Sequence, residues 1–309
     1  MIEAHSRIMS KTIAAIVNPV SGHRDLTHQI RAIGGIILSE GGSFSVKQTE
    51  RSGHATKIAA TLDGQVDAVL VVGGDGTVRE VAEGLIGGKT PIAILQTGTE
   101  NLLARELNMP VEPQRMADLL LRGRSVPHDA GVIHGRRFFA VAGVGFDALC
   151  VHRMDAVRRG HITHLDYFWP IWDSLVAYDF PMLTVTADGA EVFRDRGFVI
   201  LGIIPRYSLG LRVAARAIPN DGLIDVVMFR CCSRWSLFAH AIRIFAGTHI
   251  EHRDVTYAQC KSVRFDCDRP VPVQIDGDPG REAPAECTVV SSATRFLTGA
   301  DRSIGEPPA

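Results

Sequence analysis

AVLVVGGDGT, residues 68–77, is the part of the sequence that says most about the fold. Its first five residues form a continuous apolar run, which is typical of a strand buried on both faces. Two glycines follow, and then Val78, Val81, Ala82 and Leu85 repeat at the spacing of one helix face. A buried strand, a glycine turn and a helix in this order are typical of a parallel sheet with helices on its faces.

The turn at residues 73–77 has the chemistry of a phosphate site. Glycine lets a ligand approach the backbone closely, and the start of the next helix presents unpaired N–H groups and the positive end of a dipole. The turn is neither a Walker A loop nor a G-x-G-x-x-G fingerprint. Asp75 would repel a phosphate unless a cation lay between them, which predicts Mg²⁺ on a nucleotide. The alternative is a tight turn in which Asp75 is the N-cap of the helix.

The first part of the chain alternates strands and helices. We expect strands at residues 12–17, 44–49, 68–72 and 91–95, and helices at 26–39, 54–62, 78–86, 101–107 and 113–121. Two further polar turns, Asn18 to Gly22 and Gly98 to Asn101, follow the first and last of these strands. Ligands of open α/β sheets bind at the carboxyl ends of strands, so the three turns are expected to line one pocket. Each of them alone is also compatible with an ordinary loop.

The second part of the chain reads as an antiparallel β domain that begins near residues 127–131. Strands are expected at 138–144, 182–187, 191–193, 198–204, 223–229, 263–267 and 271–275, with helical insertions at 151–178 and 235–245. Asp188 and Gly189 lie between two alternating runs, as in a two-residue hairpin turn. The predicted fold class is therefore α/β, with a doubly wound domain first and an antiparallel β domain second.

Two late turns carry carboxylates. Residues 219–225, PNDGLID, precede one predicted strand, and residues 274–278, QIDGD, follow another. In the second turn Asp276 and Asp278 flank a glycine, and such a pair can supply a metal ligand and a general base. Both turns are also compatible with solvated loops.

Composition excludes several other classes of protein. The 309 residues are 46% hydrophobic and 22% charged, with a net charge of -1, which argues against nucleic acid as the main partner. The six cysteines contain no C-x-x-C pair and are predicted to be reduced thiols. No stretch approaches the ~20 apolar residues of a membrane span, and residues 1–11 lack the apolar core of a signal peptide. We expect a cytoplasmic protein that reaches any lipid from the water side.

With these five motifs in this order, the chain resembles the diacylglycerol kinase catalytic-domain family, which includes soluble bacterial lipid kinases and the sphingosine and ceramide kinases. The resemblance runs from about Ile13 to Leu297. It implies a nucleotide-binding domain at 11–129, rejoined by 293–305, and a β-sandwich domain for the lipid substrate at 130–292. It also implies ATP and Mg²⁺ as cofactors, with ATP bound in a cleft between the domains.

The resemblance and the turns together assign residues to roles. Nucleotide binding is expected at Asn18, Pro19, Val20, Ser21, Gly22, Thr49, Gly73, Gly74, Asp75, Gly76, Thr77, Val78, Arg79, Glu80, Thr99 and Asn101. Asp221, with the carbonyl groups of Ile218 and Leu223, matches a structural Mg²⁺ site of the family. Asp75 is expected to anchor the Mg²⁺ of the nucleotide.

Two positions depart from the family. Asp278 stands where the family usually has the glutamate that acts as catalytic base, so the base is expected to be Asp278 or Asp276. Arg79 replaces a common asparagine, and it can either pair with a phosphate or face solvent.

The lipid side of the predicted reaction is less defined. Asp147, in GFDA, is either a ligand of the lipid head group or the polar end of a strand. Residues 161–180 are rich in aromatic side chains and follow several basic ones, which suits a membrane surface at the inner face or a helix packed on the sheet. A kinase for a soluble acceptor such as NAD, and a nucleotide-binding regulator without catalysis, stay open as alternatives. A homodimer is compatible with the sequence.

Overall fold

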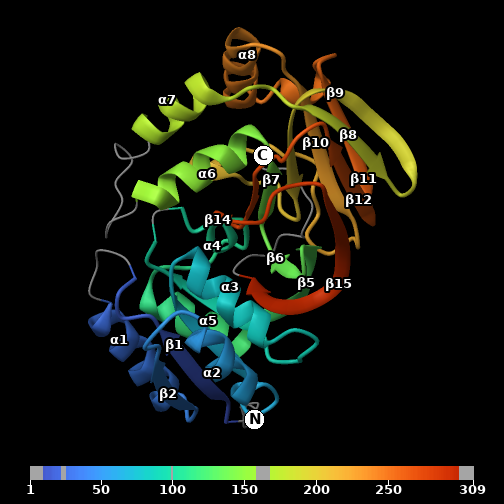
Figure 1. The fold of residues 1–309 in the computed structure, drawn as a ribbon. Helices are drawn as coiled ribbons and strands as arrows, with labels where there is room; N and C mark the ends of the chain where they lie inside the picture. The colour runs from blue at the N-terminus through green and yellow to red at the C-terminus, as the bar shows by residue number, and fades with distance from the viewer. Residues whose placement is uncertain (1–9, 22–25, 99, 158–167, 299–309) are drawn as a thin grey trace. The chain divides into compact units, whose positions relative to one another are not determined.

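The fold is described from a computed structural model of the chain. The structure describes residues 10–21, 26–98, 100–157 and 168–298. They divide into two compact units, one of residues 10–127 with 294–298 and one of residues 128–293 (Figure 1). The chain passes from the first unit to the second after Pro127 and returns to the first after Ala293. From the sequence, these two boundaries were expected after residues 129 and 292. The functions expected of the two domains stay predictions.

The first unit is built on a parallel sheet. Its strands, in the order β15-β4-β3-β1-β2, are β1 (Thr12–Val17), β2 (Ser43–Gln48), β3 (Ala68–Gly73), β4 (Ile92–Gln96) and the end of β15 (Ala285–Thr298). Every residue of β3 is buried, as its apolar run predicts. The order reverses between β1 and β3, and ligands of doubly wound sheets bind at this kind of switch point.

Helices cover both faces of this sheet. They are α1 (Thr27–Ser39), α2 (His54–Leu62), α3 (Asp75–Gly84), α4 (Leu102–Glu106) and α5 (Pro113–Arg122). Right-handed crossovers put α1 on the face opposite to α2 and α3, because the chain changes direction after β2. In agreement, α1 packs against α5 and α2 packs against α3. The predicted doubly wound α/β fold is confirmed.

The second unit is a β-sandwich of antiparallel strands. They are the end of β5 (Arg124–Ile133), β6 (Arg136–Phe138), β7 (Val141–Val144), β8 (Met182–Ala187), β9 (Ala190–Gly202), β10 (Ile224–Arg230), β11 (Val255–Cys260), β12 (Ser262–Cys267), β13 (Val273–Ile275), β14 (Asp278–Pro279) and most of β15. The first half of β9 pairs with β8, and its second half pairs with β7 and β10. This long strand therefore belongs to both layers.

Two hydrophobic cores bury both faces of β10 and of the second half of β9. Val199 and Leu201 point into the core between the layers, whereas Phe198 and Ile200 point into a second core. The second core also holds residues of α6 (Phe146–Val157), α7 (Phe168–Ala177) and α8 (Arg234–Phe245). Helices thus cover the outer face of these strands, so that both faces are buried.

Some sequence-based expectations for the second unit are confirmed and others are wrong. Asp188 and Gly189, with φ of 45° and 84°, form the expected hairpin turn between Ala187 and Ala190. The strand expected at 138–144 is interrupted, and those expected at 191–193 and 198–204 are one strand, β9. The helix expected at 151–178 is described as α6 and α7, because residues 158–167 lie outside the described part of the chain. The strands β5, β11, β14 and β15 were not predicted.

Two further features concern the whole described chain. No helix in residues 10–21, 26–98, 100–157 or 168–298 is long and apolar enough to cross a membrane. All six cysteines are free.

Candidate nucleotide and acceptor site

The turn between β3 and α3 is packed too tightly for a side chain at its first position. A Cβ added to Gly73 would lie 2.6 Å from the Cβ of Thr77, whereas one added to Gly74 would make an ordinary contact, 3.4 Å from the Oγ of Ser21. A Cβ added to Gly76, in contrast, meets no atom within 4 Å. Gly76 thus leaves open space beside the start of α3, where an anion is favoured.

Polar groups from the ends of β1, β3 and β4 meet around this turn. The Nδ2 of Asn18 donates to the Oγ1 of Thr77 at 3.0 Å, and the backbone N–H of Gly74 donates to the Oγ of Ser21 at 2.8 Å. The same Ser21 Oγ lies 2.8 Å from the Oγ1 of Thr97. The first two predicted turns and the end of β4 are thereby joined by hydrogen bonds.

Asp75 connects this network to the next helix. Its two carboxylate oxygens accept the backbone N–H groups of Asn101 and Leu102 at 2.9 and 2.8 Å. The N-cap of α3 is Gly74, so the alternative of Asp75 as the cap of its own helix is wrong, and Asp75 instead holds the start of α4. Burial raises the pKa of Asp75, while the two N–H groups act in the opposite direction. The Mg²⁺ role of Asp75 stays a prediction.

Glu80 has a comparable role at the start of α2. Its carboxylate accepts backbone N–H groups from Gly53 at 2.8 Å and from Ala55 at 3.2 Å. Thr49 precedes this segment, is buried, and donates its backbone N–H to the carbonyl oxygen of Val17 at 2.9 Å. The segment from Thr49 to Ala55 is therefore anchored to the sheet through Thr49, a predicted nucleotide-binding residue.

The other predicted nucleotide-binding residues differ in exposure. Pro19, Val20 and Gly76 are exposed, and Arg79 is half-buried. Val78 is buried in the first unit, and its backbone N–H donates to the carbonyl oxygen of Gly74 at 3.1 Å. Asn101 is buried, and its side-chain amide pairs with the backbone of Gly98. Gly22 and Thr99 lie outside the described residues.

In the second unit, Asp276 is a structural carboxylate. It accepts the backbone N–H groups of Phe139, Ala140 and Val141 at 2.8, 3.0 and 3.0 Å. These bonds explain why the strand expected at 138–144 is interrupted between β6 and β7. Asp276 itself has a φ of 48°, a left-handed conformation that aspartate tolerates better than most residues.

Asp278, two residues later, lies in a more open position. Its side chain is 38% exposed, and its Oδ2 lies 3.5 Å from the Nη2 of Arg136. The same guanidinium donates through Nη1 to the carbonyl oxygen of Pro279 at 2.8 Å. Arg136 therefore positions the short strand β14 and supplies a positive charge beside the predicted base.

Asp147 is joined to this acidic turn through Gln274. The Nε2 of Gln274 donates to the Oδ2 of Asp147 at 2.9 Å, and its Oε1 accepts the backbone N–H of Gly277 at 2.9 Å. The hydroxyl of Tyr207 donates to the other oxygen of Asp147. Burial raises the pKa of Asp147 to about 6, and the bond from Gln274 acts in the opposite direction. Two motifs far apart in sequence thus form one polar chain.

The turn at Asp221 lies beside another carboxylate. The Oδ1 of Asp221 accepts the backbone N–H of Leu223 at 3.0 Å. The backbone N–H of Asp221 donates to the carbonyl oxygen of Ile218 at 3.4 Å. Buried Asp129 accepts the N–H of Gly222 at 2.7 Å. Partial burial, and to a lesser extent the charge of Asp129, raise the pKa of Asp221.

No group of three or more His, Cys, Asp or Glu side chains in the described ranges could hold a metal ion. A cation at Asp221 would therefore depend on one carboxylate and on backbone carbonyl oxygens.

Five residues of these networks were not predicted from sequence: Thr97, Asp129, Arg136, Tyr207 and Gln274. Thr97 is adjacent to a predicted turn and Gln274 is the first residue of another, so their positions at these turns were an available signal. Asp129, Arg136 and Tyr207 contact partners that are distant in the chain, and nothing local distinguishes them.

Comparisons with known proteins agree with this architecture. The family model described as diacylglycerol kinase catalytic domain matches residues 12–133, and the model described as YegS C-terminal NAD kinase beta sandwich-like domain matches residues 140–298. A diacylglycerol kinase of Mycobacterium tuberculosis is 30% identical over 92% of this chain and 94% of its own length. One from Bacillus subtilis is 24% identical over 89% and 92%.

A solved structure gives the same result for the fold. The crystal structure of a diacylglycerol kinase from Bacillus anthracis has a TM-score of 0.68 and 20% identity, and the match covers 93% of this chain and 97% of that one. The fold and the family models define a kinase, a class of phosphotransferase. The chain belongs to the diacylglycerol kinase catalytic-domain family of lipid kinases.

Proposed function

We propose that this protein transfers the γ-phosphoryl group of ATP to the hydroxyl group of a lipid, either diacylglycerol or a related lipid. The observation that carries the proposal is the hydrogen-bonded network of Asn18, Ser21, Gly74, Thr77 and Thr97 around the start of α3. The relatives named diacylglycerol kinase support the choice of acceptor. The same proposal implies a role in phospholipid metabolism.

The residues around the first turn fit a nucleotide. The start of α3 offers backbone N–H groups, Gly76 leaves room for close approach, and the hydroxyl groups of Ser21 and Thr97 supply further polar contacts. ATP supplies the phosphoryl group, and Mg²⁺ on its phosphates would offset their charge. Asp75 would act on that ion indirectly and not as a direct ligand, since both of its oxygens already accept backbone N–H groups.

Asp278 is the proposed catalytic base. A lipid alcohol is a weak nucleophile at neutral pH, so a carboxylate that can take its proton is required. Asp276 accepts three backbone N–H groups, whereas Asp278 keeps an exposed carboxylate, which favours Asp278. Asp147 would bind the lipid head group, and its link through Gln274 to Gly277 would couple head-group binding to the acidic turn.

A structural cation at Asp221 belongs to the same proposal. The Oδ1 of Asp221 already accepts a backbone N–H, so Oδ2 and the carbonyl groups of Ile218 and Leu223 would be the ligands. The charge of Asp129 nearby would favour a cation there. Under this proposal the protein works in the cytoplasm, peripheral to the membrane that holds its substrate.

An assay with ATP, Mg²⁺ and a panel of acceptors tests the function. Diacylglycerol, monoacylglycerol, ceramide and a sphingoid base are the lipid acceptors, and NAD is included because the second family model is described as NAD kinase beta sandwich-like. We expect a phosphorylated lipid whose formation requires Asp278. Phosphorylation of NAD alone would overturn the lipid assignment, and nucleotide binding without any phosphorylated product would identify a regulator instead.

A further inference from the structure

Two helices of the second unit carry exposed apolar side chains at helical spacing. On α8 they follow each other three, four and three positions apart, are 54–82% exposed, and are Trp235, Phe238, Ile242 and Phe245. On α7 they are three and four positions apart, are 48–71% exposed, and are Trp169, Trp172 and Val176. Side chains at this spacing share one face of a helix, so each helix presents an apolar stripe to solvent.

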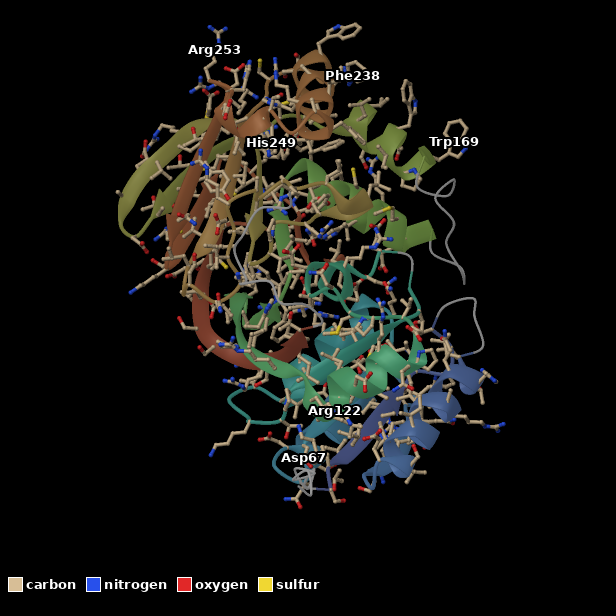
Figure 2. The ribbon with its side chains drawn as sticks, turned by 180° about the vertical axis from the view of Figure 1, so that it is seen from behind. Asp67, Arg122, Trp169, Phe238, His249 and Arg253 are labelled. Carbon is tan, nitrogen blue, oxygen red and sulfur yellow. The ribbon has the colours of Figure 1, made fainter. Side chains whose placement is uncertain are left out.

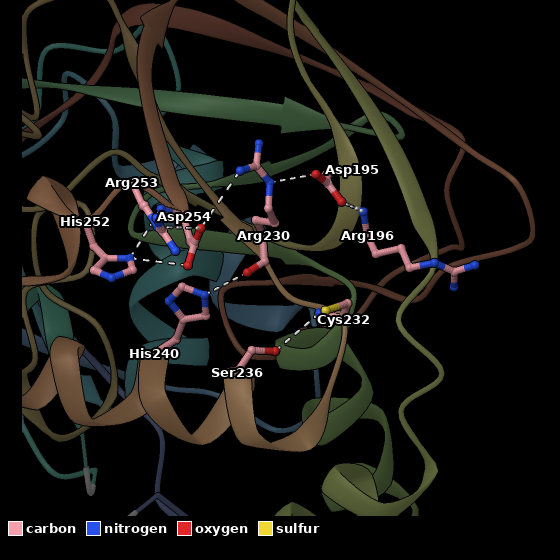
Figure 3. A network of polar contacts seen from close by, with 9 residues as sticks. All are labelled: Asp195, Arg196, Arg230, Cys232, Ser236, His240, His252, Arg253 and Asp254. Atoms are coloured by element: carbon pink, nitrogen blue, oxygen red, sulfur yellow. Dashed lines mark hydrogen bonds and ion pairs between the residues drawn. The ribbon is translucent and has the colours of Figure 1, made fainter.

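The stripe of α8 is a second apolar face, separate from the one that packs on the sandwich. Leu237 and Ile244 lie against the core formed by Phe198 and Phe229. The Nε2 of buried His240 lies 2.8 Å from the carbonyl oxygen of Arg230 in β10 (Figure 3). An ordinary surface helix needs only one apolar face, and α8 has this face already. The exposed stripe therefore does not serve the packing of the sandwich.

The two stripes belong to one surface. The guanidinium of Arg234, at the start of α8, donates to the carbonyl oxygens of Leu175 and Val176, at the end of α7, at 3.2 and 2.5 Å. Figure 1 shows the two helices as neighbours, and Figure 2 shows Trp169 and Phe238 pointing away from them. The surface of the seven side chains on α7 and α8 also carries all three tryptophans of the protein.

The charges on these helices suit an anionic lipid surface. α8 contains Arg234 and Arg243 and no acidic residue. The acidic residue of α7, Asp173, is paired with Arg153. Tryptophan and phenylalanine next to arginine are typical of segments that enter the interface between lipid head groups and acyl chains.

We propose that the α7–α8 surface inserts into the head-group region of a lipid bilayer and holds the protein on the membrane. The proposal deepens the proposed function, because a kinase for membrane lipids must work at such a surface. The aromatic stretch expected to contact either the membrane or the sheet thereby does both, since Leu175 packs on the sandwich while Trp169 and Trp172 face solvent. The proposed membrane contact also includes α8, which lies far from that stretch in sequence.

The intrinsic fluorescence of the protein tests the proposal directly, because every tryptophan lies on the α7–α8 surface. Vesicles of phosphatidylcholine and phosphatidylserine, which lack an acceptor alcohol, are added without nucleotide. We expect a blue shift of the emission and protection from iodide quenching. Unchanged emission and quenching would overturn the proposal. Shielding that grows with protein concentration in the absence of vesicles, together with a dimer in sedimentation, would assign the surface to a second copy instead.

Variants then locate the contact. Trp235→Ser combined with Phe238→Ser is expected to lower the vesicle partition coefficient in co-flotation about tenfold or more. Leu38→Ser is the matched control, because Leu38 is 59% exposed but lies in the first unit on α1. Equal partitioning of the double variant and the control would contradict the proposal, and the wild-type fluorescence result stands even if the double variant does not fold.

An activity readout separates this inference from the proposed function. On a short-chain diacylglycerol dissolved below its aggregation concentration, the double variant is expected to match the wild type. On the same acceptor in vesicles, it is expected to lose most of its rate. A wild-type protein that binds vesicles but phosphorylates no lipid would refute the proposed function and leave the membrane surface in place.

Discussion

The glycine turn at residues 73–77 and the acidic turn at residues 276–278 use their first carboxylates in the same way and their remaining groups differently. Asp75 and Asp276 each accept backbone N–H groups from a segment distant in the chain. The next residues differ: in the glycine turn the backbone of Gly76 faces open space, whereas in the acidic turn Asp278 has a carboxylate that is 38% exposed. A carboxylate in a functional motif can thus build the site without taking part in its chemistry.

The largest effect is expected at Asp278. Asp278→Ala should lower kcat for lipid phosphorylation about 10²–10⁴-fold, the usual contribution of a general base, while ATP still binds. Product formation and calorimetric binding of ATP are the measurements. Asp278→Glu, which restores the usual residue of the family, serves as the control and should keep activity. If Asp278→Ala retained its rate, the division of roles in the acidic turn would be wrong.

Asp276 should instead act on stability. Asp276→Ala leaves three backbone N–H groups without their acceptor and is expected to lower the free energy of unfolding by about 2–4 kcal/mol. Urea unfolding measures this change, and Asp278→Ala in the same experiment should stay within about 0.5 kcal/mol of the wild type. Equal destabilisation by both variants would remove the distinction between the two carboxylates.

The glycine turn allows a similar separation. Gly73→Ala brings a Cβ to 2.6 Å from the Cβ of Thr77 and should destabilise the protein by about 1–3 kcal/mol. Gly76→Ala meets no atom within 4 Å, so it should leave stability nearly unchanged and raise the KM for ATP by about tenfold. Thermal unfolding and ATP titrations compare the two variants. An unchanged KM in Gly76→Ala would mean that ATP does not approach this backbone.

The smallest expected effect is the pH dependence that Asp147 contributes. Because the pKa of Asp147 is raised to about 6, the folded state holds its proton more tightly than the unfolded state. Its contribution to stability is therefore greatest at low pH and is lost as the pH rises through 6. Between pH 8 and pH 5 the wild type should gain about 1 kcal/mol from this group, and Asp147→Asn should lack this gain.

Urea unfolding at both pH values measures the difference between the two proteins. The pKa of Asp225 is also raised to about 6, but Asp225 contributes equally to wild type and variant. Parallel stability curves for the two proteins would contradict the assignment to Asp147.

The sequence was sufficient for features that depend on local pattern. The burial of β3, the glycine turn and the hairpin at Asp188 follow from runs and turn residues that act over a few positions. The role of Asp276 was not predictable in this way, because its partners lie 135–137 residues earlier in the chain. Gln274 is a similar case, since a single side chain joins Asp147 and Gly277 and no local pattern indicates both contacts.

The path of β15 has a consequence for how the protein is made. The first part of β15 pairs with β12 in the second unit, and Phe296 then pairs with Ile92 of β4 in the first unit. On the ribosome, β4 emerges about two hundred residues before this partner, and until then one side of β4 lacks the strand that completes its sheet. The first unit to be synthesised is therefore the last to be finished, and a chain that stops before residue 294 would present an open strand edge to its neighbours.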